Sequence, residues 1–288
     1  MHLFRETIST PDALYMEYRD SPEREAERAY LESLWEVFRK HADPDFRENL
    51  CLDFLGRYWE MALGVFLCNN SLQLLRNTGA GPDFRITVPS PISIEAIAPG
   101  PGVTVDSVPT LGQIIGHRSV GAKPNDKITL RIRSAILEKQ RQYDTYRANG
   151  VVEADEAYVI AINPIKLGLV AIDTDPPHLL RATLGLGEPV AYLDHDQEEA
   201  DLENTYRPII YKRNLSQVET DIFLNESHAT ISAILMSFVK PQHRNLEPDV
   251  RLLHNPHALN SLSRDLLPGV TEYWIEGEEL FERPPQAS

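Results

Sequence analysis

The sequence predicts a mixed α/β (α+β) fold, in which a central mixed β-sheet is flanked by helices and followed by a β-rich carboxyl-terminal part. In the first half, three long segments carry apolar residues at helical spacing, and short apolar runs typical of strands lie between them. In the second half, the clear signals are those of strands. No internal repeat divides the 288 residues, so we expect a single domain over residues 1–288.

Three segments predict helices. Ser21 is a suitable N-cap, Pro22 suits the first helical position, and an apolar stripe follows them. A second amphipathic helix is expected over about residues 46–68, and a third over about residues 126–148. A loop rich in glycine and proline spans roughly residues 99–126 and separates the second helix and its following strands from the third helix.

The predicted strands begin with a hairpin. Residues 84–88 alternate between apolar and polar side chains, residues 92–98 form a second run, and a proline-rich turn joins them. Residues 157–162 form a continuous apolar run, which is typical of a buried strand. The acidic stretch 188–203, with seven carboxylates and no lysine or arginine, is interpreted as a solvated loop. Further strands are expected at residues 231–239, 250–253 and 272–281.

The charge is unevenly distributed. The net charge of −15 argues against a general nucleic-acid binder, because phosphate backbones attract lysine and arginine. Residues 1–150 are nearly balanced, with 18 basic and 20 acidic side chains, whereas residues 151–288 hold 10 basic and 23 acidic ones. Within the first half, residues 111–147 carry a local charge of +5. A basic segment over residues 118–147 is therefore available for a nucleic acid.

The chain is expected to be cytoplasmic. No apolar run approaches the roughly 18 residues that a membrane-spanning helix needs, so we predict no membrane association. The amino terminus lacks the basic stretch and apolar core of a signal peptide. The two cysteines, Cys51 and Cys68, are interpreted as reduced residues of one helix rather than a disulfide or a zinc site.

Three carboxylates stand at positions where chemistry is expected. Glu60 lies in the second predicted helix, Asp83 opens the first strand, and Glu95 lies in the second strand. The eleven residues between Asp83 and Glu95 suit a hairpin that brings both side by side. Mg²⁺ prefers oxygen ligands and keeps several waters, so one or two carboxylates on rigid strands suffice to hold it. Such an ion polarises a phosphoryl oxygen and activates water for phosphodiester hydrolysis.

The motif Pro82-Asp83, an eleven-residue gap and Glu95-Ala96-Ile97 resemble the signature of the PD-(D/E)XK nuclease superfamily. The resemblance covers roughly residues 46–163 and implies a restriction-endonuclease-like core, with residues 164–288 as an extension of unknown role. It implies Mg²⁺ (or Mn²⁺) as the cofactor. The implied metal site consists of Asp83, Glu95 and the Ala96 carbonyl, with Glu60 matching the acidic residue of the first core helix.

The sequence departs from the family pattern at one position. The motif lysine should stand two residues after the glutamate, where this chain has Ile97. Lys139 is the candidate replacement, because the spacing of its neighbours places it on the sheet-facing side of the third helix. Gln142 and Tyr146 follow it and resemble the glutamine-tyrosine motif of the superfamily's recombination exonuclease branch. We therefore expect Lys139 and Gln142 to act in catalysis with the carboxylates.

Each residue also has an ordinary structural interpretation. Pro-Asp is a common turn before a strand, one glutamate in a long helix is usually exposed, and a lysine can extend its ammonium to water. The short acidic run Asp194-His195-Asp196 and the pair His254 and His257 are interpreted as surface or loop features rather than metal sites. No nucleotide-binding, serine-hydrolase or clustered Cys/His motif is present.

The sequence leaves two functional hypotheses open. The first is a Mg²⁺- or Mn²⁺-dependent nuclease, acting on DNA rather than RNA, whose phosphate contacts come from the basic segment; the candidates are Lys123, Lys127, Arg131, Arg133 and Arg141. The second is a catalytically inactive protein of the same fold that serves as a binding or interaction module. Ile97 and the acidic second half favour this alternative, since that half is suited to a basic protein partner. Self-association as a homo-oligomer is left open.

Overall fold

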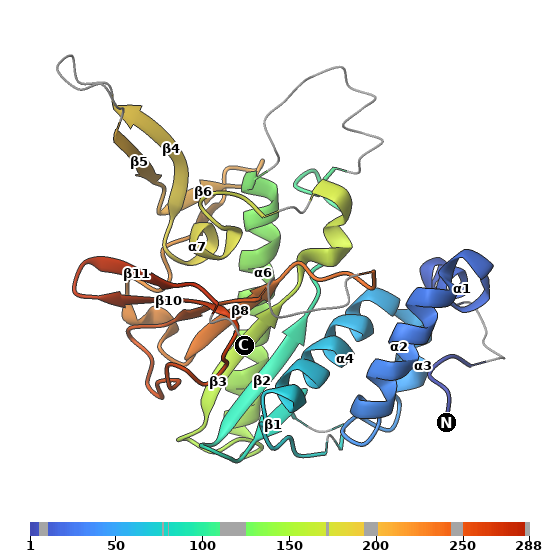
Figure 1. Cartoon of the computed structure of the whole chain (residues 1–288). Helices are drawn as coiled ribbons and strands as arrows, with labels where there is room; N and C mark the ends of the chain where they lie inside the picture. The colour runs from blue at the N-terminus through green and yellow to red at the C-terminus, as the bar shows by residue number, and fades with distance from the viewer. Residues whose placement is uncertain are drawn as a thin grey trace.

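The structure, a computed structural model, describes residues 1–5, 11–76, 78–79, 81–109, 125–170, 173–192, 201–242 and 250–285. A seven-stranded mixed sheet lies at its centre, with helices on both faces (Figure 1). Within the described residues, no helix has the length and apolar character needed to cross a membrane.

The amino-terminal helices pack together beside the sheet. Helix α1 (Ala13–Asp20) and α2 (Glu25–Phe38) are joined by a short 3₁₀ turn at residues 22–24. The hydroxyl of Ser21 accepts a hydrogen bond from the Glu23 amide, as an N-cap does. The apolar stripe predicted for α2 is buried, so this helix is confirmed.

The single helix predicted over residues 46–68 is wrong in one respect: two helices occupy this segment. Helix α3 (Phe46–Leu52) ends at Asp53, and α4 (Phe54–Asn69) begins directly after it. Asp53 has extended backbone angles (φ −142°, ψ 76°), and its carboxylate accepts a hydrogen bond from the Gly56 amide at 3.2 Å. This bond from the Asp53 side chain to a nearby backbone amide offers the backbone an alternative to the helical hydrogen-bond pattern, which explains the break.

The central sheet has the order β1-β2-β3-β8-β9-β10-β11. Strand β2 runs parallel to β3, β3 parallel to β8 and β9 parallel to β10, whereas the other three pairings are antiparallel. The predicted hairpin of β1 and β2 and the buried strand β3 are confirmed. The strands are β1 (Phe84–Ile86), β2 (Ile92–Ile97), β3 (Ala157–Ile162), β8 (Ala233–Ser237), β9 (Val250–His254), β10 (Thr271–Glu276) and β11 (Glu279–Arg283).

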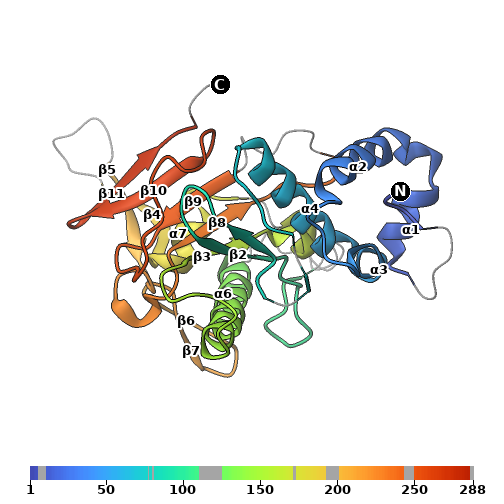
Figure 2. The ribbon, with the colours of Figure 1, turned by 90° about the horizontal axis from the view of Figure 1, so that it is seen from below.

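Each face of the sheet has its own core. Helices α1 to α4 cover one face, where Ile94, Val159 and Leu235 point. Helix α6 (Asn125–Ala148) and α7 (His178–Thr183) cover the other, which receives Ile160 and Ile234. In Figure 2, α6 lies below the sheet and the amino-terminal helices lie to its right. Because both faces of β3 are covered, its six residues are all buried, as the apolar run predicted.

The second half of the chain completes the sheet rather than forming a separate part. Strand β8 lies directly beside β3, so the carboxyl-terminal strands extend the sheet from its middle. The single strand predicted at residues 272–281 is wrong, because β10 and β11 form a hairpin that turns at Gly277, which has a φ of 65°.

The acidic stretch predicted as a loop is in part a hairpin. Strands β4 (Leu186–Tyr192) and β5 (Asp201–Tyr206) pair in antiparallel fashion and project from the body of the molecule (Figure 1). Residues 193–200, which include Asp194-His195-Asp196, lie outside the described residues. A smaller hairpin of β6 (Ile209–Tyr211) and β7 (Gln217–Glu219) follows.

Candidate functional site

The hairpin register brings Asp83 and Glu95 face to face. Phe84 pairs with Ile94 and Arg85 with Ser93, and the same register continues to Asp83 opposite Glu95. The Asp83 carboxylate accepts a hydrogen bond of 2.8 Å from the Ala96 amide, which fixes it against β2. The sequence spacing therefore predicted this juxtaposition correctly.

Glu95 is buried and paired with Lys139. Its side chain is 1% exposed, and its Oε2 accepts a hydrogen bond of 2.6 Å from the Lys139 ammonium. The other oxygen, Oε1, is also buried, and Asp83 interacts with the same carboxyl group. Lys139 comes from α6, 44 residues further along the chain. A cation from a neighbouring helix thus contacts the glutamate that the motif lysine would otherwise accompany.

Two further residues of α6 hold Lys139 in place. The Lys139 ammonium donates a hydrogen bond of 3.0 Å to Oε1 of Gln142, and Nε2 of Gln142 donates one of 2.5 Å to the Tyr146 hydroxyl. Because residues three and four apart share a helix face, this chain of bonds follows from the sequence spacing once α6 forms. Beneath it, the Tyr158 hydroxyl on β3 donates to the Lys139 carbonyl at 2.8 Å.

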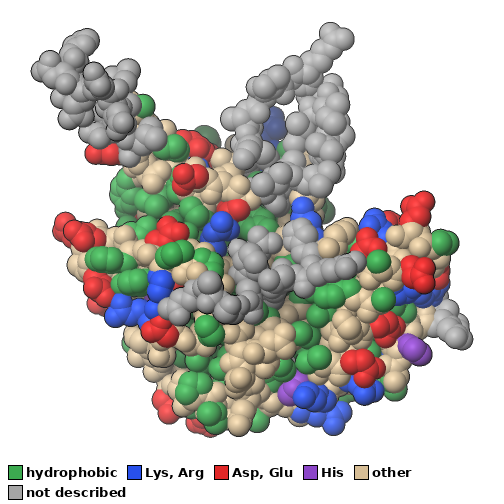
Figure 3. All heavy atoms as spheres, in the orientation of Figure 1, with side chains coloured by type: hydrophobic (Ala, Val, Ile, Leu, Met, Phe, Trp, Pro, Cys, Tyr) green, Lys and Arg blue, Asp and Glu red, His purple; other side chains and the backbone are tan. Residues whose placement is uncertain are grey.

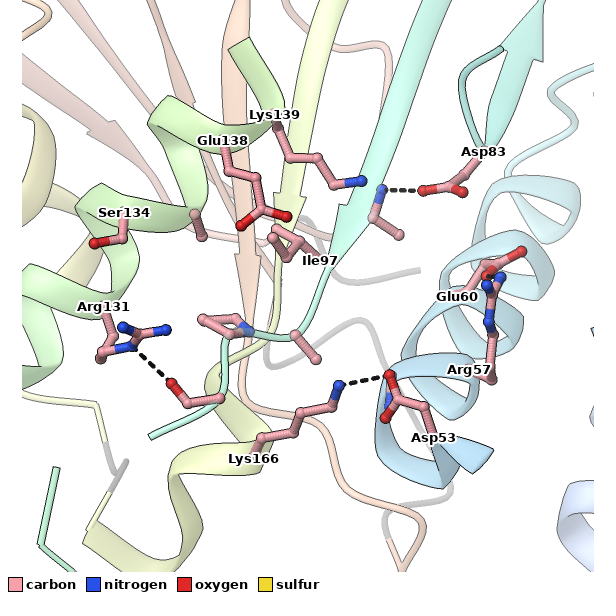
Figure 4. A pocket seen from close by; sticks show the side chains of 16 residues that line it. Asp53, Arg57, Glu60, Asp83, Ile97, Arg131, Ser134, Glu138, Lys139 and Lys166 are labelled. Carbon is pink, nitrogen blue, oxygen red and sulfur yellow. Dashed lines mark hydrogen bonds and ion pairs between the residues drawn. The ribbon is translucent and has the colours of Figure 1, made fainter. Parts of the chain in front are cut away.

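Glu60 lies on α4, close to Asp83 but held by its own partner. Its side chain is buried, and its Oε2 accepts a hydrogen bond of 2.5 Å from the Arg57 guanidinium one turn earlier. Arg57 also reaches Asp43 at 3.5 Å. Figure 4 shows Glu60 and Arg57 side by side on the helix that borders the pocket. Helix α4 is anchored to the sheet there by the Trp59 indole, which donates to the Ala161 carbonyl at 3.0 Å.

These residues surround a cavity of about 330 Å³ at the carboxyl end of β2 (Figure 4). Its walls come from α4, the end of β2 with the residues after it, α6 and the turn after β3. Glu95 itself is not among the lining residues, whereas its neighbour Ala96 and its partner Lys139 are. The charged residues that line the cavity are Asp53, Arg57, Glu60, Asp83, Arg131, Glu138, Lys139 and Lys166.

Burial and the charge of Asp83 raise the pKa values of two carboxylates of the site, Glu60 and Glu95. Burial, together with the charge of Asp83, raises the pKa of Glu60 to about 8, against the lowering effect of Arg57. Burial and Asp83 likewise raise the pKa of Glu95 to about 8, although the Lys139 ammonium opposes the shift. Burial lowers the pKa of Lys139, but the charges of Glu95 and Asp83 outweigh it and the net shift is upward. Lys139 therefore remains an ammonium at neutral pH.

Ile97 stands where the resemblance to PD-(D/E)XK nucleases would place a lysine, and it packs in the core. Its partly buried side chain packs against the apolar cluster of α6 and β3 and borders the cavity near Lys139 (Figure 4). Because residues two apart share a strand face, Ile97 and Glu95 point to the same side of β2. An aliphatic side chain there supplies no charge, and the ammonium of Lys139 reaches the same carboxylate from the helix.

The donor set suits a hard divalent cation. Two carboxylates on adjacent strands, the Ala96 carbonyl and bound water are ligands of the kind that Mg²⁺ accepts. Burial and the charge of Asp83 raise the pKa values of Glu60 and Glu95, so the ionised forms are disfavoured, and a bound cation would favour them. Within the described residues, no three His, Cys, Asp or Glu side chains gather into one ligand group. Asp83, Glu95, the Ala96 carbonyl and Glu60 therefore stay predicted ligands.

The outcome differs among the lysine and arginine residues that were expected to contact phosphate. The prediction that Arg133 contacts phosphate is wrong. Its side chain is buried and donates a hydrogen bond of 2.6 Å to the Glu219 carbonyl, under the β6–β7 hairpin. Arg131 lines the cavity, Lys127 donates to the carbonyls of Val105 and Ser107, and Arg141 is exposed. Lys123 and the basic segment before Asn125 lie outside the described residues. Figure 3 shows basic and acidic side chains intermixed over the face that it presents.

Four charged lining residues, Asp53, Arg57, Glu138 and Lys166, were not predicted from the sequence. Arg57 carries a local signal, because it stands three residues before Glu60 on one helix. Lys166 follows β3, and ligands of α/β sheets commonly bind beyond the carboxyl ends of strands. Its ammonium pairs with Asp53 at 2.6 Å across 113 residues, a contact that no sequence spacing indicates. Glu138 precedes Lys139 on the exposed side of α6 and carries no distinguishing signal.

Comparisons with known proteins were negative. No protein-family model, no curated protein and no solved structure matches the chain. The resemblance to PD-(D/E)XK nucleases therefore depends on the motif residues and on the geometry of the cavity that they border.

Proposed function

We propose that the protein is a Mg²⁺- or Mn²⁺-dependent nuclease that hydrolyses phosphodiester bonds, in DNA in preference to RNA. The observation that carries the proposal is the hydrogen bond of 2.6 Å between Lys139 and the buried Glu95. A buried lysine requires a charged partner, and here the partner is the motif glutamate opposite Asp83. The absence of a lysine at Ile97 is thereby compensated.

We also propose that the core is restriction-endonuclease-like. Helix α4 with Glu60, the hairpin of β1 and β2 with Asp83 and Glu95, helix α6 and the parallel strand β3 occur in the order that the family resemblance implies. The sheet is larger than the segment of residues 46–163, because four more strands follow β3 in it.

Asp83, Glu95 and the Ala96 carbonyl would hold the metal ion in this proposal. The ion would supply Lewis acidity at the phosphoryl oxygen and an acidified water molecule. Lys139 donates hydrogen bonds to the attacking water or to a non-bridging phosphate oxygen, and Gln142 with Tyr146 keeps its ammonium aimed at the site. Arg57 holds the Glu60 carboxylate, which orients a water molecule or binds a second ion.

The first experiment is a calorimetric titration of Mn²⁺ into the purified protein, with Asp83→Asn and Glu95→Gln beside it. Asp144→Asn is the matched control, because Asp144 is an exposed carboxylate elsewhere on α6. We expect saturable binding by the parent and the control, and loss of binding in both site variants. Single- and double-stranded DNA and RNA are then screened for Mn²⁺-dependent cleavage.

Two results would count against the proposal. If the parent binds no Mn²⁺ even with an oligonucleotide present, a metal-dependent enzyme is ruled out. If Glu95→Ala cleaves as well as the parent, the site is placed wrongly. Metal-independent binding of a partner that is insensitive to Asp83→Ala would instead support the alternative of an inactive interaction module.

A further inference from the structure

We infer that Arg131 binds a second phosphate of the substrate, next to the one that is cleaved, so that the preferred substrate is a nucleic-acid strand with a charged flanking phosphate. The inference rests on the proposed function, because it names what the far end of the same cavity contacts. Arg131 lies on α6 and lines the cavity together with Lys139.

The cations of the cavity differ in how they are paired. Lys139, Arg57 and Lys166 each contact a carboxylate, at 2.6 Å, 2.5 Å and 2.6 Å respectively. Among the described residues, Arg131 is in no such ion pair, and its one hydrogen bond runs from Nε to the Gly100 carbonyl at 2.7 Å. That bond holds the guanidinium by one edge. The two terminal nitrogens remain as donors, and a planar fork of this kind suits phosphate oxygens.

Arg131 and Lys139 lie at different positions along the cavity. The two residues are eight positions apart on α6, which places their Cα atoms about 12 Å apart along the helix axis. Both side chains extend from α6 into the cavity at different heights: Figure 4 shows the Lys139 ammonium on the side of Asp83 and the Arg131 guanidinium beside the backbone after β2. Lys166 stands at the same far end of the cavity, where its charge adds to the attraction for an anion.

The net negative charge of the protein makes binding of a nucleic acid depend on local contacts such as the one with Arg131. With a net charge of −15, the protein repels a polyanion at long range, so binding depends on cations that are placed where the strand lies. The α6 residues that line the cavity, at positions 131, 134, 135, 138 and 139, recur at spacings of three and four and form one continuous stripe. A strand that follows the stripe from the carboxylates meets Arg131 one or more phosphates away from the cleaved bond.

The test uses oligonucleotides in which single phosphates are replaced, one position at a time, by uncharged methylphosphonates. Cleavage by the parent is compared with that of Arg131→Gln, Arg131→Lys and the control Arg213→Gln, which changes an exposed arginine that lies outside the basic segment and does not line the cavity. We expect one flanking methylphosphonate to raise the parent's KM about tenfold, because one charge-assisted contact is lost. Arg131→Gln should show the same loss on the unmodified strand and no further loss on that one substrate, and Arg131→Lys should retain part of the affinity.

Affinity for the same oligonucleotides in Ca²⁺, measured by fluorescence anisotropy, gives a readout that does not require cleavage. A parent that binds with the expected position dependence but does not cleave would overturn the proposed nuclease and leave the phosphate contact supported. If removal of a terminal phosphate reproduces the effect, Arg131 contacts a chain end rather than an internal diester. Equal sensitivity of parent and Arg131→Gln to every methylphosphonate, or no binding at all, would overturn the inference.

Discussion

At the scale of single residues, the site depends on how one ammonium is shared. Lys139 pairs with a buried glutamate that also interacts with Asp83, the residue directly before β1. A lysine in this position has two effects. It stabilises the buried charge of Glu95, and it competes with any metal ion for the same carboxylate.

Lys139→Met separates these two effects. We expect cleavage to fall by about a hundredfold or more, because the donor that stabilises developing charge is lost. We expect Mn²⁺ affinity to be retained or increased, since the competing ammonium is gone. Cleavage rates and calorimetry on the same preparation check both, with Gln142→Glu as a comparison that keeps the lysine. Loss of Mn²⁺ binding in Lys139→Met would show that the lysine maintains the site only structurally.

A second residue-scale prediction concerns His228, which lies outside the cavity. Burial, and secondarily the charge of Arg133, lowers the pKa of His228 to about 4 in the folded protein, while its Nδ1 lies 2.6 Å from Oε1 of Gln140. The unfolded chain has a histidine pKa near about 6.5, so it binds more protons than the folded chain between these values. The stability contributed by neutral His228 is therefore complete above about pH 6.5 and is lost as the pH falls towards about 4.

The free energy of unfolding should fall less between about pH 6.5 and about pH 4 in His228→Gln than in the parent. We expect the difference to be on the order of 2–3 kcal/mol. Urea denaturation at several pH values between 4 and 7 measures the effect, with His257→Gln as a control at a more exposed histidine. Parallel curves for the parent and His228→Gln would contradict the assignment.

At the scale of elements, α4 approaches the sheet closely because Gly64 has no side chain. A Cβ at this position would lie 2.5 Å from the Phe38 ring on α2 and 3.0 Å from the Phe84 ring on β1. These aromatic rings are buried, with exposed fractions of 1% and 2%, and pack against each other with centroids 6.1 Å apart. The glycine thus sets the distance between the helix that carries Glu60 and the strand that follows Asp83.

We expect Gly64→Ala to lower the free energy of unfolding by about 1–3 kcal/mol, despite a gain in helix propensity of about 1 kcal/mol. The combination with Phe38→Leu should recover part of the loss, because the smaller ring site accepts the methyl group. Chemical denaturation of the two single variants and the double variant measures this coupling. Strict additivity of the two changes would mean that the predicted clash does not occur.

At the scale of the whole molecule, the two halves of the chain share one sheet. Strand β3 has β2 on one side and β8 on the other. Just before β8, the Ser232 amide donates a hydrogen bond of 2.7 Å to the Tyr158 carbonyl of β3. Without the second half, the buried edge of β3 would be unpaired. Helix α6 would also lose the apolar cluster that it shares with α7 and β8.

We therefore expect a chain that ends at Asn163 to be unfolded or aggregated, although it contains every predicted catalytic residue. Near-ultraviolet circular dichroism and size-exclusion chromatography of residues 1–163, with the full chain as reference, measure this. A monomeric truncated protein with cooperative unfolding would show that the motif-bearing half is an independent domain.

The sequence by itself determined the local features. Periodicity predicted α2, α6 and β3, the hairpin spacing predicted that Asp83 and Glu95 meet, and helical spacing placed Lys139, Gln142 and Tyr146 on one face. These succeed because helix and strand geometry fix which side chains share a face. Prediction from the sequence failed at two kinds of position. A local side-chain contact ended an element at Asp53, between α3 and α4, and a glycine turned the chain between β10 and β11.

Only the tertiary structure decided the rest. Burial of Arg133, pairing of Lys166 with Asp53 and insertion of β8 beside β3 join residues up to 113 positions apart. Such contacts depend on how whole elements pack, and a single sequence carries no periodic signal for them. The same packing buries Glu60 and Glu95 next to Asp83 and raises their pKa values, which turns three separate carboxylates into a candidate site.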